Sequence, residues 1–385
     1  MVELRTVRIG DLGRVMTGKT PPSSQPELFG DLHPFLTPTD IDGFARYIEP
    51  ARFLSPEGRD YQHRLMLPER AVCVVCIGAT IGKVCMTGRP SFTNQQINSV
   101  VVNENEYDPF FIYHLLTTLR DELKSNAGGA ATPIINKTAF SEIEVSVPPL
   151  PMQRRIAGFL SAYDELIENS QKRIRILETM ARALYREWFV QFRFPGHEKV
   201  PLVASALGDI PQGWEVKKLG DILKLNYGKA LKKEERHGGQ FPVFGSSGIV
   251  GYHDASLVNG PGIIVGRKGN VGSVFWCDED FFVIDTAYFV TSTIPLRYLF
   301  YVLPTLNFIN SDAAVPGLSR NQAYTLEMLF PPAALLTRFS EMAETFQQQA
   351  STLRSQINNL HRTRDLLLPR LLSGQVKLEN QESKE

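Results

Sequence analysis

Asparagine, glutamine, lysine and threonine gather in short segments of the sequence that are rich in turn-forming residues. Three such segments lie in the N-terminal part of the chain: Thr17-Gly18-Lys19-Thr20, residues 93–98, and Asn136-Lys137-Thr138. Side-chain amides can pair bidentately with adenine, and lysine or arginine with guanine or with phosphate. These segments therefore predict contacts to a nucleic acid. Solvated loops without a binding role are the alternative interpretation.

A second group of candidates lies beyond residue 210, in a locally basic stretch. Residues 214–276 contain nine lysines and arginines against five aspartates and glutamates, whereas the whole chain has 41 of each sign. The absence of net charge excludes a wholly basic nucleic-acid binder, but a local footprint on phosphate groups fits the pattern. The candidate DNA-contacting residues are Lys19, Thr20, Lys83, Asn94, Gln95, Gln96, Asn136, Lys137, Lys229, Lys232, Lys233, Arg267, Lys268, Asn270 and Arg320.

The motifs of catalytic chemistry are missing from the sequence. No Pro-Pro pair forms the tetrapeptide of an amino-group DNA methyltransferase, and the segment ending in Gly82-Lys83 is one residue short of a phosphate-binding P-loop. Cys73-Val74-Val75-Cys76 has no second Cys/His pair at zinc spacing, which favours buried cysteines over a metal site. The seven histidines form no ligand or triad spacing. We therefore expect no catalytic residue, metal or cofactor in this chain.

The elements that must position the candidates occur twice along the chain. Short apolar or alternating runs, separated by Gly, Pro, Asn and Asp, are typical of strands joined by turns. A repeat of roughly 190 residues is far longer than a solenoid unit of about 20–50, so we predict two copies of one domain-sized module. The matching segments are Ile9-Gly10-Asp11 with Leu219-Gly220-Asp221 and Gly18-Lys19 with Gly228-Lys229 (offset 210), Gly82 with Gly272 (offset 190), and Val147-Pro148-Pro149 with Phe330-Pro331-Pro332 (offset 183).

Each module is followed by a long segment in which apolar residues alternate at spacings of four and three. Eighteen of twenty such positions are apolar, which predicts two helices of about five heptads paired as a coiled coil. Ordinary amphipathic helices on a globular core are the alternative. Breakers at Phe194-Pro195-Gly196 and at Leu368-Pro369 with Ser373-Gly374 predict their ends. The positions are Ile156, Leu160, Tyr163, Ile167, Ser170, Ile174, Leu177, Ala181, Leu184 and Trp188, and, in the second copy, Phe339, Ala343, Phe346, Ala350, Leu353, Ile357, Leu360, Arg364, Leu367 and Leu371.

The order of these motifs resembles the specificity subunits of type I restriction-modification systems over nearly the whole chain. The second module departs from the first, with Leu336 where the first has Gln153, and with Ile284-Asp285-Thr286 where the first has Asn94-Gln95-Gln96. The resemblance rests on Gly18-Lys19-Thr20-Pro21, residues 35–41, residues 78–83, Asn94-Gln95-Gln96, residues 148–156, residues 184–190, residues 241–248, Gly266-Arg267-Lys268-Gly269 and Leu371-Leu372-Ser373-Gly374.

The resemblance implies an α+β chain with two pseudo-symmetric α/β target-recognition domains, separated by two long antiparallel coiled-coil helices. The expected segments are a first recognition domain (1–150), a central helix (151–194), a linker with the second recognition domain (195–331), a C-terminal helix (332–376) and a polar tail (377–385). Helices of about 37 residues would be roughly 55 Å long and would hold the two domains apart.

The same resemblance implies a non-catalytic subunit that reads a bipartite, asymmetric site in double-stranded DNA. Two modification (adenine methyltransferase) subunits would dock on the helices, with Trp188, Phe189 and Phe192 either as docking anchors or as core residues that cap the bundle. S-adenosylmethionine, ATP and Mg²⁺ would belong to those subunits and to two restriction (nuclease-translocase) subunits, whose presence stays open. Two other functions are kept as alternatives: a coiled-coil scaffold that binds proteins only, and an enzyme with an unrecognised site.

The sequence also predicts where the protein works. Its first residues contain no apolar signal region, and the longest apolar stretch without charges, near residues 71–79, is far short of a membrane span. Four cysteines in 385 residues do not form a disulfide framework. We therefore expect a cytoplasmic protein with no membrane partner.

Overall fold

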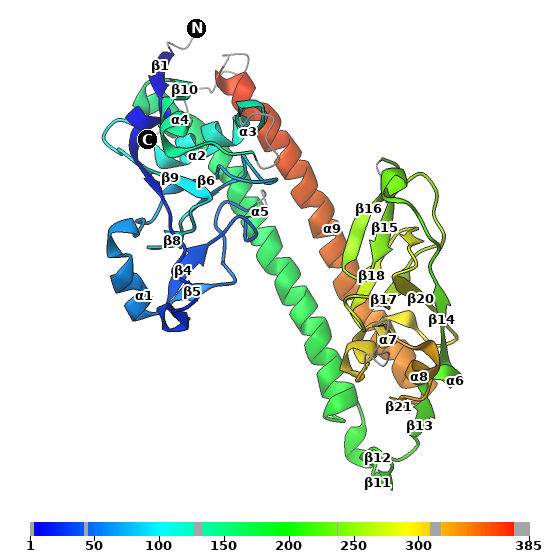
Figure 1. Ribbon diagram of the computed structural model, residues 1–385. Coiled ribbons are helices and arrows are strands. Elements are labelled where there is room, and N and C mark those ends of the chain that lie inside the picture. Colours follow the sequence, from blue (N-terminus) through cyan, green and yellow to red (C-terminus); the bar gives the residue numbers. More distant parts are fainter. Residues whose placement is uncertain (1–3, 42–44, 127–132, 237, 309–316, 373–385) are drawn as a thin grey trace, which may run out of the picture. The chain divides into compact units, whose positions relative to one another are not determined.

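The computed structural model describes residues 4–41, 45–126, 133–236, 238–308 and 317–372 (Figure 1). Contacts between residues divide the chain into two compact units. Unit 1 comprises Met1–Arg173 with Leu353–Glu385, and unit 2 comprises Ile174–Thr352. Both long helices are therefore shared between the units, and each unit combines a strand-rich globular region with one part of each helix.

The central sheet of unit 1 has four antiparallel strands in the order β2-β9-β6-β7. The bounds are β2 (Gly13–Thr17), β9 (Ile97–Val102), β6 (Val72–Val75) and β7 (Val84–Met86). Strand β6 is buried on both faces, as expected of its uninterrupted apolar sequence. Thr17 and Asn98 are paired across β2 and β9, so the ends of these strands bring two of the predicted polar segments together.

Smaller sheets and short helices complete unit 1. One sheet has the order β3-β5-β4-β8, with β4 and β8 parallel, and β1 pairs with β10 to form another. Helix α2 begins where the Asp108 carboxylate accepts a hydrogen bond from the Phe111 amide, and its Pro109 suits the first turn. The bounds are β1 (Arg5–Arg8), β3 (Phe29–Gly30), β4 (His33–Leu36), β5 (Phe53–Leu54), β8 (Phe92–Thr93), β10 (Glu144–Val147), α1 (Pro56–Tyr61), α2 (Pro109–Thr118), α3 (Arg120–Asn126) and α4 (Lys137–Glu142).

Unit 2 repeats the strand order of the central sheet and the β1–β10 pair, but its third sheet has three strands instead of four. Its four-stranded sheet has the order β14-β20-β17-β18, strand β15 pairs antiparallel with β16 and parallel with β19, and β13 pairs with β21. A hairpin of β11 and β12 precedes them. The bounds are β11 (Leu202–Ser205), β12 (Gly208–Pro211), β13 (Glu215–Lys218), β14 (Leu223–Tyr227), β15 (Phe241–Gly245), β16 (Gly248–His253), β17 (Gly262–Gly266), β18 (Val274–Cys277), β19 (Phe282–Val283), β20 (Ala287–Ser292), β21 (Glu327–Phe330), α6 (Leu219–Ile222), α7 (Leu296–Val302) and α8 (Arg320–Tyr324).

The repeat predicted from the sequence is confirmed for the strands of the central sheets and for the β1–β10 and β13–β21 pairs. Strands β2 and β14 begin at Gly13 and Leu223, which is the offset of 210 found for the first motifs. The offset falls to 190 between β9 and β20 and to 183 between β10 and β21. The three offsets equal those of the sequence motifs. Most of the extra residues of the first module lie between β2 and β6, where unit 1 has strands β3, β4 and β5 and helix α1.

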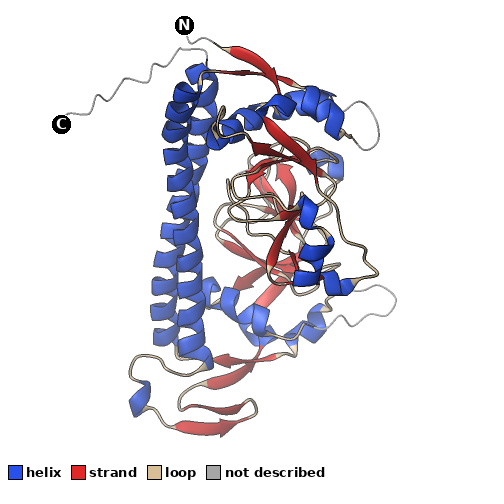
Figure 2. Ribbon diagram, turned by 90° about the vertical axis from the view of Figure 1, so that its left-hand side faces the viewer, coloured by secondary structure: helices blue, strands red, loops and turns tan. Residues whose placement is uncertain are grey.

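The two long helices are α5 (Leu150–Tyr185) and α9 (Ala333–Leu372), and they lie side by side (Figure 2). None of the twenty spaced positions is exposed. In unit 1 the start of α5 shares a core with the end of α9, and in unit 2 the end of α5 shares a core with the start of α9. The predicted antiparallel pairing is therefore confirmed.

The ends of the helices differ from the prediction. Helix α5 gives way at Arg186 to a π-helical turn that ends at Val190, before the breaker at Pro195. Pro369 lies inside the last turn of α9 instead of ending it, because Leu368 and Leu371 on either side are buried in the core of unit 1. The predicted stop at Ser373-Gly374 and the tail 377–385 lie outside the described residues.

Candidate nucleic-acid interface

The same tight turn follows the first strand of the four-stranded sheet in both units, which is β2 in unit 1 and β14 in unit 2. In unit 1 the Lys19 amide donates to the Thr93 carbonyl at 3.0 Å, and in unit 2 the Lys229 amide donates to the Val283 carbonyl at 2.9 Å. Both turns require glycine before the lysine. A Cβ atom at Gly18 would lie 2.1 Å from the Thr93 carbonyl oxygen, and one at Gly228 would lie 2.2 Å from the carbonyl oxygen of Ile284. This turn fixes the position of the predicted loops in each unit.

In unit 1 the turn and the amide-rich loop are joined by side chains. The Gln95 Oε1 atom accepts hydrogen bonds from the Thr20 hydroxyl (2.7 Å) and the Thr20 amide (3.3 Å). Asn94 is buried, and its side chain donates to Gln96 Oε1 (2.9 Å) and accepts from the Gln96 amide (3.0 Å). Asn94 therefore shapes the loop, while Gln95 and the adjacent Lys19 are exposed.

The other candidates of unit 1 have mixed environments. Lys83 Nζ donates to the Ile41 carbonyl at 2.6 Å and lines a cavity of about 320 Å³, so its ammonium group supports the fold. Asn136 caps α4 by accepting from the Ala139 amide at 2.9 Å. Lys137, the first residue of α4, is exposed. No described residue pairs with the Lys137 ammonium group, which can therefore contact a phosphate or a base edge, whereas Lys83 and Asn136 have internal partners.

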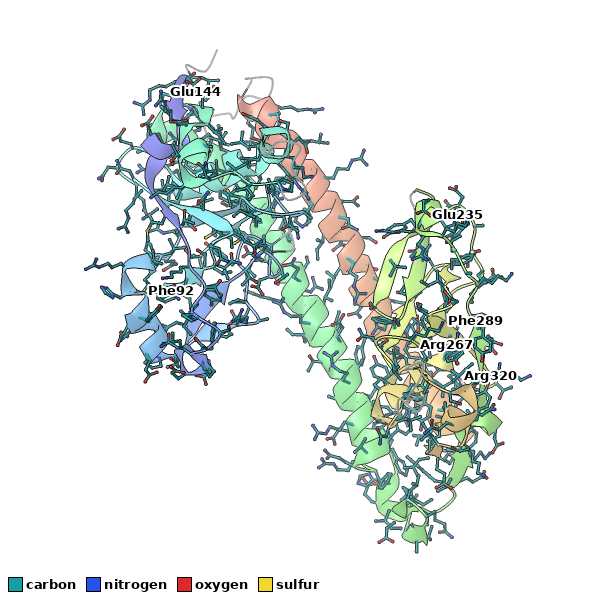
Figure 3. The ribbon with its side chains drawn as sticks, viewed as in Figure 1. Phe92, Glu144, Glu235, Arg267, Phe289 and Arg320 are labelled. Atoms are coloured by element: carbon teal, nitrogen blue, oxygen red, sulfur yellow. The ribbon has the colours of Figure 1, made fainter. Side chains whose placement is uncertain are left out.

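Unit 2 contains a cluster of two arginines around one tyrosine. The Arg267 and Arg320 guanidinium carbons each lie 4.9 Å from the centre of the Tyr227 ring (Figure 3 labels both arginines). Tyr227 is 48% exposed and packs against Tyr288, its partner across β14 and β20, with ring centres 5.1 Å apart. Burial raises the pKa of Tyr288 to about 12, so its hydroxyl stays protonated. It donates to the Leu318 carbonyl at 3.0 Å.

The remaining basic candidates of unit 2 lie at its surface. Lys229, Lys232 and Lys233 are exposed, as is Asn270. Lys268 lies 3.8 Å from the carboxylate of Asp285. Ion pairs of this kind reduce the local excess of positive charge, so the basic patch is weaker than the residue count indicates.

The aromatic candidates for partner docking are core residues. Trp188 and Phe189 are 5% and 3% exposed, and the Phe189 ring centre lies 4.8 Å from Tyr298 and 5.0 Å from Phe339. Phe192 is half-buried against Trp214, with ring centres 5.3 Å apart. The geometry favours the alternative in which these side chains cap the core of unit 2. Aromatic residues at a helix end look alike in sequence whether they face solvent or a core.

Sequence reasoning missed Tyr227 and the buried charges of the helix pair. Tyr227 precedes Gly228-Lys229 as Thr17 precedes Gly18-Lys19, so the repeat itself was the signal that could have found it. Asp164 of α5 and Arg364 of α9 are paired at 2.7 Å although both are buried. His361 of α9 is also buried. The sequence alone does not distinguish a buried charged residue of a helix from an exposed one.

No described part of the chain gathers three or more His, Cys, Asp or Glu side chains that could hold a metal ion. The described helices include none that is long and apolar enough to cross a membrane. Cys73 and Cys76 are buried, as predicted, and burial raises the pKa of Cys76 to about 11. This thiol is therefore protonated at neutral pH and is a poor nucleophile.

The sequence matches the model of the type I restriction modification DNA specificity domain over residues 1–179 and 211–322, which is most of the chain. The chain belongs to this family. It is therefore a DNA specificity subunit of the type I restriction-modification class, and this family is non-catalytic. The resemblance seen in the motifs is confirmed.

Two curated relatives and one solved structure agree with this assignment. The MjaIX specificity subunit of Methanocaldococcus jannaschii is 26% identical, with 97% of this chain and 93% of the relative covered. The HindI specificity subunit of Haemophilus influenzae is 34% identical over 44% of this chain and 38% of its own. The fold is similar to that of the S subunit crystal structure from M. genitalium, with a TM-score of 0.55, 19% identity and 96% of each chain covered.

Proposed function

We propose that this specificity subunit reads a split, asymmetric duplex site, with one half read by each unit. The observation behind this proposal is that the two units share one backbone framework but have different side chains at equivalent places. Base contacts carry sequence information, whereas backbone contacts only position the protein, so different side chains at equivalent places predict different half-sites. The equivalent pairs are Thr17 and Tyr227, Asn98 and Tyr288, Ile77 and Arg267, Thr20 and Ala230, Gln95 and Asp285, and Lys137 and Arg320.

The exposed lysines next to these positions supply contacts to the DNA backbone. Lys19 and Lys137 in unit 1, and Lys229, Lys232 and Lys233 in unit 2, are all exposed. Each ammonium group that neutralises a phosphate releases a counterion, which gives affinity without sequence preference. In this proposal the lysines hold the subunit on the duplex while the neighbouring loops read the bases.

The long helices serve as the spacer and as the docking surface for partner subunits. The 36 residues of α5 span about 54 Å, which corresponds to roughly 16 base pairs at ~3.4 Å each. Its outward face carries Phe159, Leu166, Ile176 and Met180, all exposed in this chain. We propose that two modification subunits cover this face and supply S-adenosylmethionine, and that restriction subunits, where they are present, supply ATP and Mg²⁺.

Salt-dependent binding to duplex DNA tests this proposal. The subunit, assembled with its modification subunits, is titrated with duplexes that carry the methylated motif of its host, at several salt concentrations. We expect the logarithm of the binding constant to fall linearly with the logarithm of the salt concentration. We also expect Gln95→Ala to relax discrimination between bases in one half of the motif only. Binding that is absent or independent of salt would instead support a scaffold that binds proteins only.

A further inference from the structure

Tyr227, Arg267 and Arg320 form a cluster that has no counterpart in unit 1. They come from three elements, since Tyr227 ends β14, Arg267 follows β17 and Arg320 begins α8. At the equivalent places unit 1 has Thr17, Ile77 and Lys137, and the Thr17 hydroxyl is used in a 2.6 Å hydrogen bond to Asn98. The two units thus share a strand pair but present different chemistry at its end.

The Arg267 guanidinium is fixed by its surroundings. It donates through Nη1 to the Asp285 carbonyl at 3.1 Å and lies 4.9 Å from the Tyr227 ring centre. The Arg267 carbonyl accepts from the Leu318 amide at 2.7 Å. Because Leu318 is two residues before Arg320, this bond also anchors the start of α8 next to the Tyr227 ring.

The Tyr227 ring fixes the direction of the Arg320 guanidinium. It lies against the Tyr227 ring, and among the described residues its N–H groups have no hydrogen-bond acceptor. Contact with an aromatic face restricts a planar guanidinium, whose five donors then point outward in a known fork. The side chain is therefore arranged in advance for a ligand that offers two acceptors.

Charge favours an electron-rich ligand at this place. The two guanidinium carbons each lie 4.9 Å from one ring centre, so the two cations are at most about 10 Å apart, which is about one Debye length at physiological salt. The neighbouring Asp285 carboxylate is 3.8 Å from Lys268, and its main-chain carbonyl is the group that meets Arg267. An acceptor ligand would relieve the repulsion between the two cations.

We propose that Arg320 reads a guanine base edge in the half-site of unit 2, positioned by Tyr227 and Arg267. This inference rests on the proposed function. The O6 and N7 atoms of guanine are the acceptor pair in the major groove that matches a guanidinium fork. A phosphate offers similar acceptors, but the exposed and flexible Lys229, Lys232 and Lys233 already serve that role without a fixed direction.

The test is the variant Arg320→Lys, which keeps the charge and removes the fork. The assembled complex is titrated with duplexes in which each base pair of the motif is changed in turn, at two salt concentrations. We expect roughly 10- to 100-fold loss of discrimination at one G·C pair of one half-site, with the other half unchanged. Tyr227→Leu should produce a smaller loss at the same pair, and Tyr227→Phe, which keeps the ring, should not.

Arg362→Lys is the matched control, because Arg362 is an exposed arginine of α9. Uniform weakening on all duplexes, with no base pair affected more than the others, would show that Arg320 contacts a phosphate and would overturn the inference. An unchanged preference at every base pair would overturn it as well. In both cases a motif that is still split and asymmetric leaves the proposed function intact, whereas a continuous motif removes the proposed function itself.

Discussion

At the scale of single residues, a buried charge network joins the two long helices in unit 1. Arg364 of α9 donates to Asp164 of α5 at 2.7 Å, and His114 of α2 and Arg46 approach the other carboxylate oxygen to 3.2 and 3.8 Å. At the place equivalent to Asp164, unit 2 has the neutral Gln347, whose Nε2 lies 3.4 Å from the Tyr301 hydroxyl of α7. A single buried polar partner in an apolar seam fixes how two helices align.

We predict that Asp164→Asn strongly destabilises the subunit. The change removes the buried counter-charge that Arg364 and Arg46 share, while Arg364 keeps Asp365 and Arg46 keeps Glu168 as partners at the edge of the network. Removing one partner of a fully buried pair costs about 3–5 kcal/mol of unfolding free energy, which sets the upper limit for this variant. Urea unfolding at neutral pH measures the difference. Glu165→Gln, an exposed neighbour on the same helix, is the control and should change stability very little. Equal stability of both variants would contradict the role given to the network.

The same carboxyl predicts the sign of a pH effect. Burial disfavours the charged form of Asp164, but His114 and Arg364 outweigh it and hold the pKa of the carboxyl below its usual range. The stability that this group contributes is therefore complete above its unfolded pKa of about 4, and it is lost as the pH falls through the folded pKa. The difference in unfolding free energy between the wild type and Asp164→Asn should therefore become smaller only at acid pH.

At the scale of elements, the sequence predicted the regular parts well and the irregular parts poorly. The spacing of apolar residues identified both long helices, because a buried seam needs apolar side chains wherever it lies. Polar loops were harder, since side chains such as Asn94 and Asn136 have the same types whether they bind a ligand or hold a turn. Arg364 appeared as an interruption of the seam, and only the structure identified Asp164 as its partner.

We predict that the length of α5 sets the spacer of the DNA site. Inserting four residues near Ser170, which is half-buried, adds about 1.1 turns and roughly 6 Å, close to two base pairs, and nearly preserves the apolar face. Inserting two residues would rotate the rest of the helix by roughly 200° and turn its apolar stripe to solvent. Motif mapping should show a wider spacer with both halves unchanged for the first variant, and no assembly for the second. An active four-residue variant with the original spacer would show that the helices do not set the distance.

At the scale of the whole molecule, the chain consists of two copies of one module with different side chains at the same places. Strand order and the turn around Gly18 or Gly228 are common to both units, so the framework itself gives no sequence preference. Because the motifs occur twice, the two modules could be predicted from the sequence. The divergence between the copies is where specificity must lie, and it could be found in the sequence only by comparing the modules position by position.

A map of methylated adenines in a host with and without this gene tests most directly whether each unit reads its own half-site. We expect a methylated motif that depends on the gene and has two different halves separated by bases that are not read. We also expect that Gln95→Ala changes one half and Arg320→Lys the other. A continuous palindromic motif, or a variant that alters both halves equally, would contradict the assignment of one half-site to each unit.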